Sequence, residues 1–368
     1  MNKFFKLDWV LIISIMLLLV IGLLVIYSIS FDGSVLKSAN LERQVVAIAI
    51  GFASMFFLAF SDYRKLNTHS TKLYFLMLFI LMVVLVAGKT VKGHTGWLGF
   101  SSFSVQPVEL AKLIIIIFLA SFLSKKRTQL SIVVRIVASV VLVFLPVFLI
   151  LKQPDLGSTV IILACWVTLL FTSGASKKNL LILFIAGAII LSPSWFFLKN
   201  YQKDRIVNFI EPYRDPMGSG YNVIQSTIAV GSGQLFGKGL GHGSQSQLNF
   251  LPEKHTDFIF SVIAEELGFF GAMAVFVLFG VIFWRLKETA RAARDNFGYL
   301  FTIGVMAMIF FQLLVNVGMN IGVMPVAGVP LPLLSYGGSS MVTTLAAIGI
   351  AQNVYLRRKK SNSFDNLR

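Results

Sequence analysis

The feature that most constrains the fold is a series of mostly apolar runs, each close to the roughly 20 residues with which a helix crosses a bilayer. With 56% hydrophobic and only 13% charged residues, the chain carries more apolar surface than a soluble domain of its length buries. The sequence therefore predicts an all-α polytopic membrane protein with about ten transmembrane helices, formed by residues 1–368 as a single domain. The predicted spans are 9–29, 44–61, 73–88, which should extend at one end, 108–123, 132–151, 156–173, 180–198, 258–284, 299–317 and 336–356.

The net charge of +16 could suggest nucleic-acid binding, but the cations lie in short loops between the apolar runs. The positive-inside rule explains that placement, since cytoplasmic loops carry an excess of Lys and Arg. Both termini, including the tail 357–368, are therefore expected in the cytoplasm. The cations on that side are Lys3, Lys6, Arg64, Lys65, Lys72, Lys125, Lys126, Arg127, Lys177, Lys178, Arg285, Lys287, Arg291, Arg294, Arg357, Arg358, Lys359 and Lys360.

Two outer loops stand apart from the rest. Loop 199–257, between the seventh and eighth predicted helices, is too long for a plain connection and contains aromatic and amphipathic stretches. We expect short helices there, which lie at the membrane interface and pack onto the bundle. Loop 318–335 is apolar, yet its prolines and glycines break a regular helix. Such backbone at membrane depth must contact protein or a cavity, so we expect a re-entrant or interfacial loop.

The strongest local signal for chemistry is Glu253-Lys-His255-Thr-Asp257, where the long loop meets a predicted span. Asp257 at the start of a helix would complement the helix dipole as a capping group. Alternatively, it is a general base at the outer mouth of the bundle. Ser261 and Glu265 follow Asp257 at helical spacing, so the three are expected on one helix face, with Glu265 and the adjacent glutamate deeper along the span.

Three further clusters carry polar groups. Glu109 and Lys112, three residues apart, share a helix face and form either a neutralised pair or a contact for an anionic group. Asp155 is expected to be an N-cap. The glycine-rich run 231–243 is not a P-loop, and it either brings backbone N–H groups to a phosphate or forms a tight turn. Arg205, Arg214 and Lys238 in the same loop are candidate pyrophosphate contacts.

Neither the histidines nor the cysteine suggests a metal or disulfide site. The four histidines are scattered, with no zinc-binding spacing. Cys165 lies inside an apolar run and is expected to be a packed core thiol.

Together these stretches resemble the SEDS family (shape, elongation, division and sporulation). The run 245–257, Gln-Ser-Gln-Leu-Asn-Phe-Leu-Pro-Glu-Lys-His-Thr-Asp, is similar to the elongation branch of that family rather than its division branch. The resemblance covers essentially the whole chain. One departure is Gly96-Trp97, where family members often carry an Arg-Trp pair. The other similar stretches, in the family's order, are Gln106–Lys112, Lys152–Gly157, Tyr221–Gly233 and Gly328–Ser339.

The resemblance implies a peptidoglycan glycosyltransferase that polymerises lipid II at the outer face of the bacterial cytoplasmic membrane during cell elongation. It implies Asp257 as the essential acidic residue, acting as general base in an inverting reaction, and a class B penicillin-binding protein as partner. A divalent cation, Mg²⁺ or Mn²⁺, is a candidate cofactor, and no organic cofactor is expected. The candidate substrate contacts are Glu109, Lys112, Arg205, Gln225, Lys238, Gln247, Glu253, His255 and Ser335.

Two other functions remain open at the level of sequence. A lipid II flippase would also be polytopic with charges inside the membrane, although the chain shows no inverted repeat. A scaffold that only recruits a penicillin-binding protein would need no buried Glu109–Lys112 pair. The discriminating property is chemical, because a flippase moves lipid II unchanged whereas a polymerase lengthens it.

Overall fold

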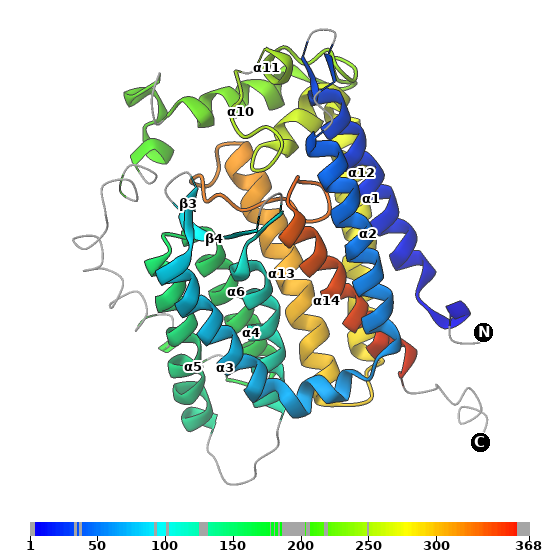
Figure 1. The fold of residues 1–368 in the computed structure, drawn as a ribbon, viewed down its shortest axis with the longest axis vertical. Coiled ribbons are helices and arrows are strands. Elements are labelled where there is room, and N and C mark those ends of the chain that lie inside the picture. Colours follow the sequence, from blue (N-terminus) through cyan, green and yellow to red (C-terminus); the bar gives the residue numbers. More distant parts are fainter. Residues whose placement is uncertain are drawn as a thin grey trace.

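The fold is a bundle of long apolar helices capped at one end by shorter helices and loops (Figure 1). A computed structural model describes residues 4–358 except for 33–34, 37–38, 92–93, 101–102, 125–131, 177, 180, 183–184, 186–202, 204–206, 217–219 and 249. The long helices are α1 (Trp9–Ile29), α2 (Ala39–Phe60), α3 (Tyr63–Ala87), α4 (Pro107–Ser124), α5 (Ile132–Lys152), α6 (Leu156–Thr172), α12 (Ile259–Arg291), α13 (Asn296–Asn320) and α14 (Gly338–Leu356).

Within the described residues, seven of these helices are long and apolar enough to cross a membrane. The mainly helical membrane fold predicted from the sequence is confirmed. The short third run extends at its N-terminal end, because Asp62 caps α3 by accepting a hydrogen bond from the backbone N–H of Arg64. Most of the predicted span 180–198 lies outside the described residues and stays a prediction.

The outer connections contain small antiparallel sheets in addition to the helices. Strand β1 (Phe31–Asp32) pairs with β2 (Val35–Leu36). Strands β3 (Lys89–Val91), β4 (His94–Phe100) and β5 (Phe103–Val105) form a second sheet in that order, with Lys89 opposite Trp97 and Gly99 opposite Ser104. The expected short helices of the long loop are present as η2 (Pro212–Arg214), α10 (Tyr221–Ser232) and α11 (Ser244–Gln247), while η1 (Phe4–Lys6) precedes α1.

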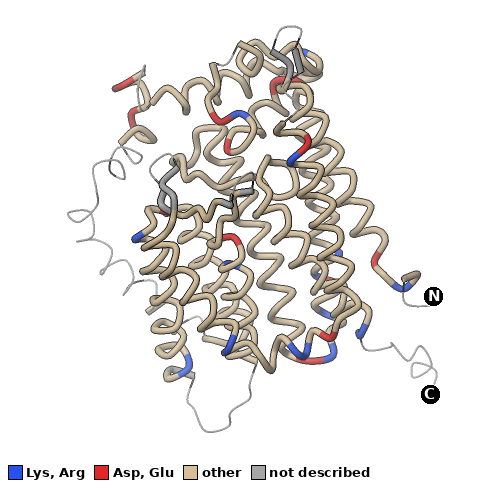
Figure 2. The backbone as a smooth tube through the Cα atoms, viewed as in Figure 1, with Lys and Arg blue, Asp and Glu red and all other residues tan. Residues whose placement is uncertain are grey.

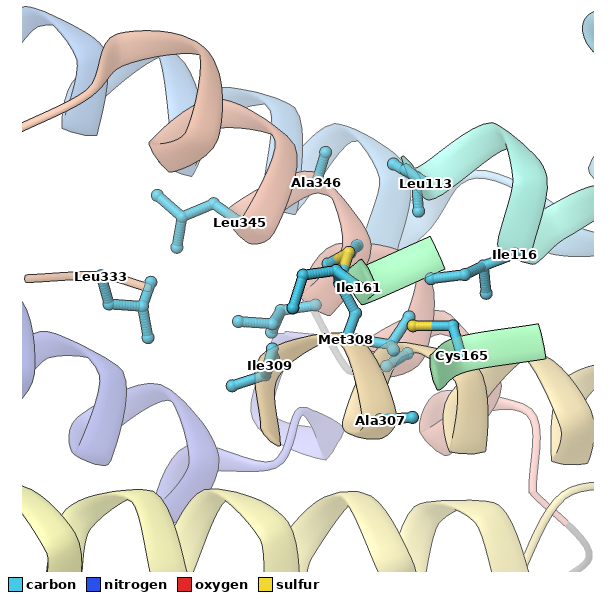
Figure 3. Packing of buried hydrophobic residues seen from close by; sticks show 14 of the residues in the cluster. Leu113, Ile116, Ile161, Cys165, Ala307, Met308, Ile309, Leu333, Leu345 and Ala346 are labelled. Atoms are coloured by element: carbon cyan, nitrogen blue, oxygen red, sulfur yellow. The ribbon is translucent and has the colours of Figure 1, made fainter. Parts of the chain in front are cut away.

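The core lies where α4, α6, α13 and α14 meet (Figure 3). Leu113, Ile161 and Met308 contribute from three of these helices, and Leu333 reaches the same cluster from the loop before α14. Cys165 is only 2% exposed there, so the prediction of a packed core thiol is confirmed.

Both ends of the described chain lie at the same end of the bundle, where many of the cations gather (Figures 1 and 2). Asp8 caps α1 and binds Arg285 of α12 at 2.7 Å, which ties the N-terminus to that end of the bundle. Arg357, after α14, binds Asp62 at 3.4 Å. This arrangement agrees with termini on one side of a membrane.

The predicted span 258–284 corresponds to α12, which is long and apolar enough to cross a membrane but is broken at Gly268. This residue has φ 67° and ψ −164°, a backbone conformation essentially confined to glycine. The backbone N–H groups of Lys238 and Gly239 cap the first segment by binding the carbonyls of Glu265 and Glu266. Residues 259–267 thus form a short helix under the outer loop, and the long helix toward the inner end begins only after Gly268.

Replacing Gly268 with alanine should destabilise the protein by about 3 kcal/mol or more. The new Cβ would be strained by the positive φ and would lie 2.2 Å from the backbone nitrogen of Gly237. Gly280→Ala, later in the same helix, is the matched control because a Cβ there meets nothing within 4 Å. Melting temperatures in detergent measure both variants, and an equal change in the two would contradict this account of the break.

Candidate active site

Asp257 lies at the junction of the long outer loop with α12, and its backbone is fixed by α13. The side-chain amides of Asn316 and Asn320 donate hydrogen bonds to the Asp257 carbonyl oxygen at 2.9 and 3.0 Å. Helix α12 begins at Ile259 with Phe258 as its N-cap, so Asp257 precedes the helix and is not its N-cap. The expected helix face shared by Asp257 and Glu265 is therefore not formed.

The loop between α13 and α14 is the re-entrant element expected beside the site. Asn316, which holds Asp257, also donates to the carbonyl of Val329 at 2.8 Å. A Cβ on Gly328 would lie 3.7 Å from Asp257 Oδ2, so this loop borders the carboxylate directly. Further on, Leu334 packs against Gly22 of α1, which lies seven residues before the end of that helix. At 1.5 Å per residue, the loop descends about 10 Å into the bundle.

Ser335 connects this re-entrant loop to the backbone just before Asp257. Its hydroxyl donates to the carbonyl of Thr256 at 2.6 Å and accepts from the N–H of Leu331 at 2.8 Å. The next residue, Tyr336, donates its N–H to the carbonyl of His255 at 2.8 Å. Ser335 therefore holds the site together, and its predicted contact with substrate stays a prediction.

The imidazole of His255 is partly buried in this loop. Burial, with the adjacent charge of Lys254, lowers the pKa of His255 to about 4. Nδ1 has no hydrogen-bond partner within the described part of the chain. The ring is thus neutral at pH 7, with a buried Nδ1 that lacks a hydrogen-bond partner in the described residues, two residues from Asp257.

The lowered pKa of His255 predicts a loss of stability in acid. The unfolded chain takes up this proton near pH 6.5 and the native chain only near pH 4. Between these values the unfolded state binds more protons, so stability falls as the pH falls from about 6.5 to about 4. His255→Gln should reduce that slope, which melting temperatures across this pH range measure, and equal slopes in both proteins would refute the prediction.

The other predicted contacts from the outer loop lie before, within and after α11. Glu253 forms a turn with φ 55°, and its carbonyl accepts the N–H of Thr256 at 3.0 Å. Gln247 donates to the carbonyl of Ser28 at 3.1 Å, at the outer end of α1. Gln225 lies partly buried on α10, which packs on α12 and α13. The contacts of these residues with substrate stay predictions.

Glu265 and Glu266 do not lie deep in a span, contrary to expectation. Glu265 is fully buried and accepts hydrogen bonds from the backbone N–H groups of Gln245 and Ser246, at 2.9 and 3.1 Å. Glu266 accepts from the hydroxyl of Ser28 at 2.7 and 2.8 Å. Because the helix breaks at Gly268, both carboxylates face the outer loop, which they hold onto α1 and α12.

Two candidate cations, Lys112 and Lys238, are already paired with carboxylates. Lys238 Nζ lies 3.0 Å from Glu265 Oε1, and the glycine run around it forms a tight turn, which was one of the two expectations. Lys112 Nζ lies 2.7 Å from Glu109 Oε1, with both side chains almost completely buried in α4. Arg205 lies outside the described residues.

Asp155 forms the predicted N-cap, accepting from the N–H of Ser158 at 2.9 Å.

The residues around Asp257 do not amount to a preformed metal cage. In the described ranges, no group of three His, Cys, Asp or Glu side chains could hold a metal ion. A Mg²⁺ or Mn²⁺ ion would therefore need substrate phosphates for most of its ligands, as Mg²⁺ commonly does.

The comparisons with known proteins agree over nearly the full length. The model of the FtsW/RodA/SpoVE family, described as cell cycle proteins, matches residues 8–360. The chain belongs to this family. Stage V sporulation protein E of Bacillus subtilis is 38% identical over 94% of this chain and 96% of its own length. Peptidoglycan glycosyltransferase MrdB of Escherichia coli K12 is 37% identical over 96% of this chain and 94% of its own.

Solved structures of family members have the same fold. A chain from a peptidoglycan synthase complex that coordinates polymerization and crosslinking has a TM-score of 0.80 at 33% identity, over 96% of this chain and 99% of that one. The rod shape determining protein RodA of Thermus thermophilus has a TM-score of 0.72 at 30% identity, over 96% of this chain and 98% of that one.

The polar residues that position Asp257 from neighbouring helices were not among those predicted from the sequence. Asn316 and Asn320 lie one turn apart in the mostly apolar helix α13, and Gln44 lies in α2. Polar side chains inside a membrane-spanning run default to function or pairing, and this was the available signal.

Proposed function

We propose that this chain is a peptidoglycan glycosyltransferase that polymerises lipid II into glycan strands at the outer face of the bacterial cytoplasmic membrane during cell elongation. One observation carries the proposal. Asp257 is a carboxylate whose backbone is fixed between α13 and the re-entrant loop, near the outer end of the bundle. A fixed acid beside a membrane-embedded loop suits a reaction on a sugar whose lipid anchor stays in the bilayer.

Asp257 would act as the general base of a single displacement. The 4-hydroxyl of an incoming lipid II attacks the anomeric carbon of the lipid-linked muramic acid on the growing strand. As the new C–O bond forms, the hydroxyl proton passes to the Asp257 carboxylate, because a free alkoxide is inaccessible near neutral pH. The bond from the anomeric carbon to the phosphate oxygen breaks, and its electron pair leaves with the pyrophosphate. The α-linked donor then gives a β-linked product, which is an inversion.

The leaving pyrophosphate develops negative charge that nearby cations would stabilise. Lys112 and Lys238 are the candidates within the described residues, each held in place by a glutamate. A divalent cation bound through substrate phosphates would add to that charge. Because pyrophosphate leaves without protonation, the reaction needs no second catalytic carboxylate, unlike most sugar hydrolases. Glu109 would then orient Lys112.

The proposed partner is a class B penicillin-binding protein, which would crosslink the strands as they emerge. A solved structure with the same fold comes from a peptidoglycan synthase complex, which supports this assignment. The proposed orientation places both termini in the cytoplasm, in accordance with the cations at that end of the bundle.

The deciding experiment separates polymerisation from transport. Purified protein, in liposomes with lipid II, Mg²⁺ or Mn²⁺ and a crosslinking-inactive penicillin-binding partner, should convert lipid II into glycan polymer visible on a gel. A flippase would move lipid II across the bilayer unchanged, and a scaffold would do neither. Absence of polymer from a well-folded complex would overturn the proposed function.

A further inference from the structure

The side chain of Gln44 in α2 is almost completely buried, at 1% exposure. Both polar atoms of its amide form hydrogen bonds with the segment that connects the re-entrant loop to α14. Its Nε2 donates to the carbonyl of Ser335 at 3.1 Å. Its Oε1 accepts from the N–H of Gly337 at 3.2 Å. A glutamine is suited to this position because one side chain supplies a donor and an acceptor at once.

Residues 335 and 336 in turn form hydrogen bonds with the backbone immediately before Asp257. On the side away from Gln44, the hydroxyl of Ser335 donates to the carbonyl of Thr256 at 2.6 Å. The N–H of Tyr336 donates to the carbonyl of His255 at 2.8 Å. Two consecutive peptide groups immediately before Asp257 are thereby held by the segment that Gln44 holds.

The position of Asp257 therefore depends on two helices. Helix α13 acts directly, through Asn316 and Asn320 on the Asp257 carbonyl. Helix α2 acts indirectly, through Gln44 and residues 335–337. Helices α2 and α14 pack along each other, with Gly349 of α14 close to the backbone of Met55 in α2. The hydrogen bonds of Gln44 therefore connect this closely packed helix pair to the backbone before Asp257.

We propose that Gln44 is a positioning residue for the proposed general base, which it fixes from α2 through the backbone of Ser335 and Gly337. This inference rests on the proposed function of Asp257. The Gln44 amide binds the backbone of residues 335 and 337 and not the Asp257 carboxylate, so its loss should misplace the base without removing it. A misplacement of about 1 Å can lower a rate about 100-fold.

Gln44→Leu removes both hydrogen bonds at similar volume. We expect kcat for lipid II polymerisation to fall about 10- to 100-fold, with KM within about twofold of wild type. Gln312→Leu is the matched control, since Gln312 is a buried glutamine of α13 whose Oε1 has no partner within the described residues. Its kcat should stay within about twofold of wild type, since the substitution removes no hydrogen bond to Oε1 within the described residues.

Gln44→Glu supplies a second test, because a protonated carboxyl has one donor and one acceptor like the amide. Its activity relative to wild type at the same pH should rise as the pH falls. Hydrogen exchange of peptides covering 251–258 and 331–338 gives a readout independent of catalysis, with faster exchange expected in Gln44→Leu and no change in Gln312→Leu.

The outcomes separate the two proposals. An inactive wild type would overturn the proposed function, while faster exchange in Gln44→Leu would still support the link from α2 to the backbone before Asp257. A polymerising Gln44→Leu with wild-type kcat, equal losses in the two leucine variants, or a pH-independent activity ratio for Gln44→Glu would overturn the positioning role. If Gln44→Leu does not fold, the pH dependence of Gln44→Glu decides.

Discussion

Asp257→Asn is expected to lower kcat for lipid II polymerisation by about 10²–10⁴-fold, the usual contribution of a positioned general base. The substitution keeps the size and shape of the side chain but removes its ability to take a proton near neutral pH. The fold should be unaffected, because the hydrogen bonds from Asn316 and Asn320 reach the backbone carbonyl of residue 257, which is unchanged. Polymer yield and initial rate, compared with wild type at equal protein, measure the effect.

Asp62→Asn provides a control with the same change of chemistry. Asp62 caps α3 at the opposite end of the bundle, where it also binds Arg357 at 3.4 Å. Asparagine caps helices about as well as aspartate, and a partly exposed ion pair contributes little. This variant should polymerise within about twofold of wild type. More than half of wild-type activity in Asp257→Asn would remove Asp257 from the role of base.

The helical spans could be predicted because a bilayer requires a similar number of apolar residues, about 20, in each spanning helix. The predicted run 132–151 corresponds to α5 (Ile132–Lys152), and 336–356 to α14 (Gly338–Leu356). The break at Gly268 could not be predicted in the same way. Hydropathy averages over a window, whereas this break depends on capping by backbone groups of residues about 30 positions earlier, such as Lys238 binding Glu265.

The same distinction holds for the candidate site. The Glu109–Lys112 pair could be predicted because helical spacing alone brings the two side chains together. The contacts of Asn316 and Gln44 could not, because both bind backbone groups that only the folded chain brings near. The sequence therefore singled out Asp257 as a candidate by its motif, while the hydrogen bonds that hold its backbone became visible only in the tertiary structure.

The second large effect concerns the buried Glu109–Lys112 pair, whose charged atoms lie 2.7 Å apart with side chains 4% and 2% exposed. Lys112→Met should destabilise the protein by about 3–5 kcal/mol, because it leaves the Glu109 carboxylate buried without its counter-charge. Glu109→Gln should destabilise by a similar amount for the opposite reason. Melting temperatures of both single variants in detergent measure the loss.

The double variant Glu109→Gln/Lys112→Met separates stability from catalysis. Removing both charges leaves no unpaired ion, so most of the lost stability should return. If Lys112 stabilises the leaving pyrophosphate, this folded double variant should still polymerise at least about 100-fold more slowly than wild type, as when a transition-state donor is removed. A double variant with wild-type stability and wild-type kcat would instead assign the pair to holding the bundle together, and the charge on the leaving group would then fall to Lys238.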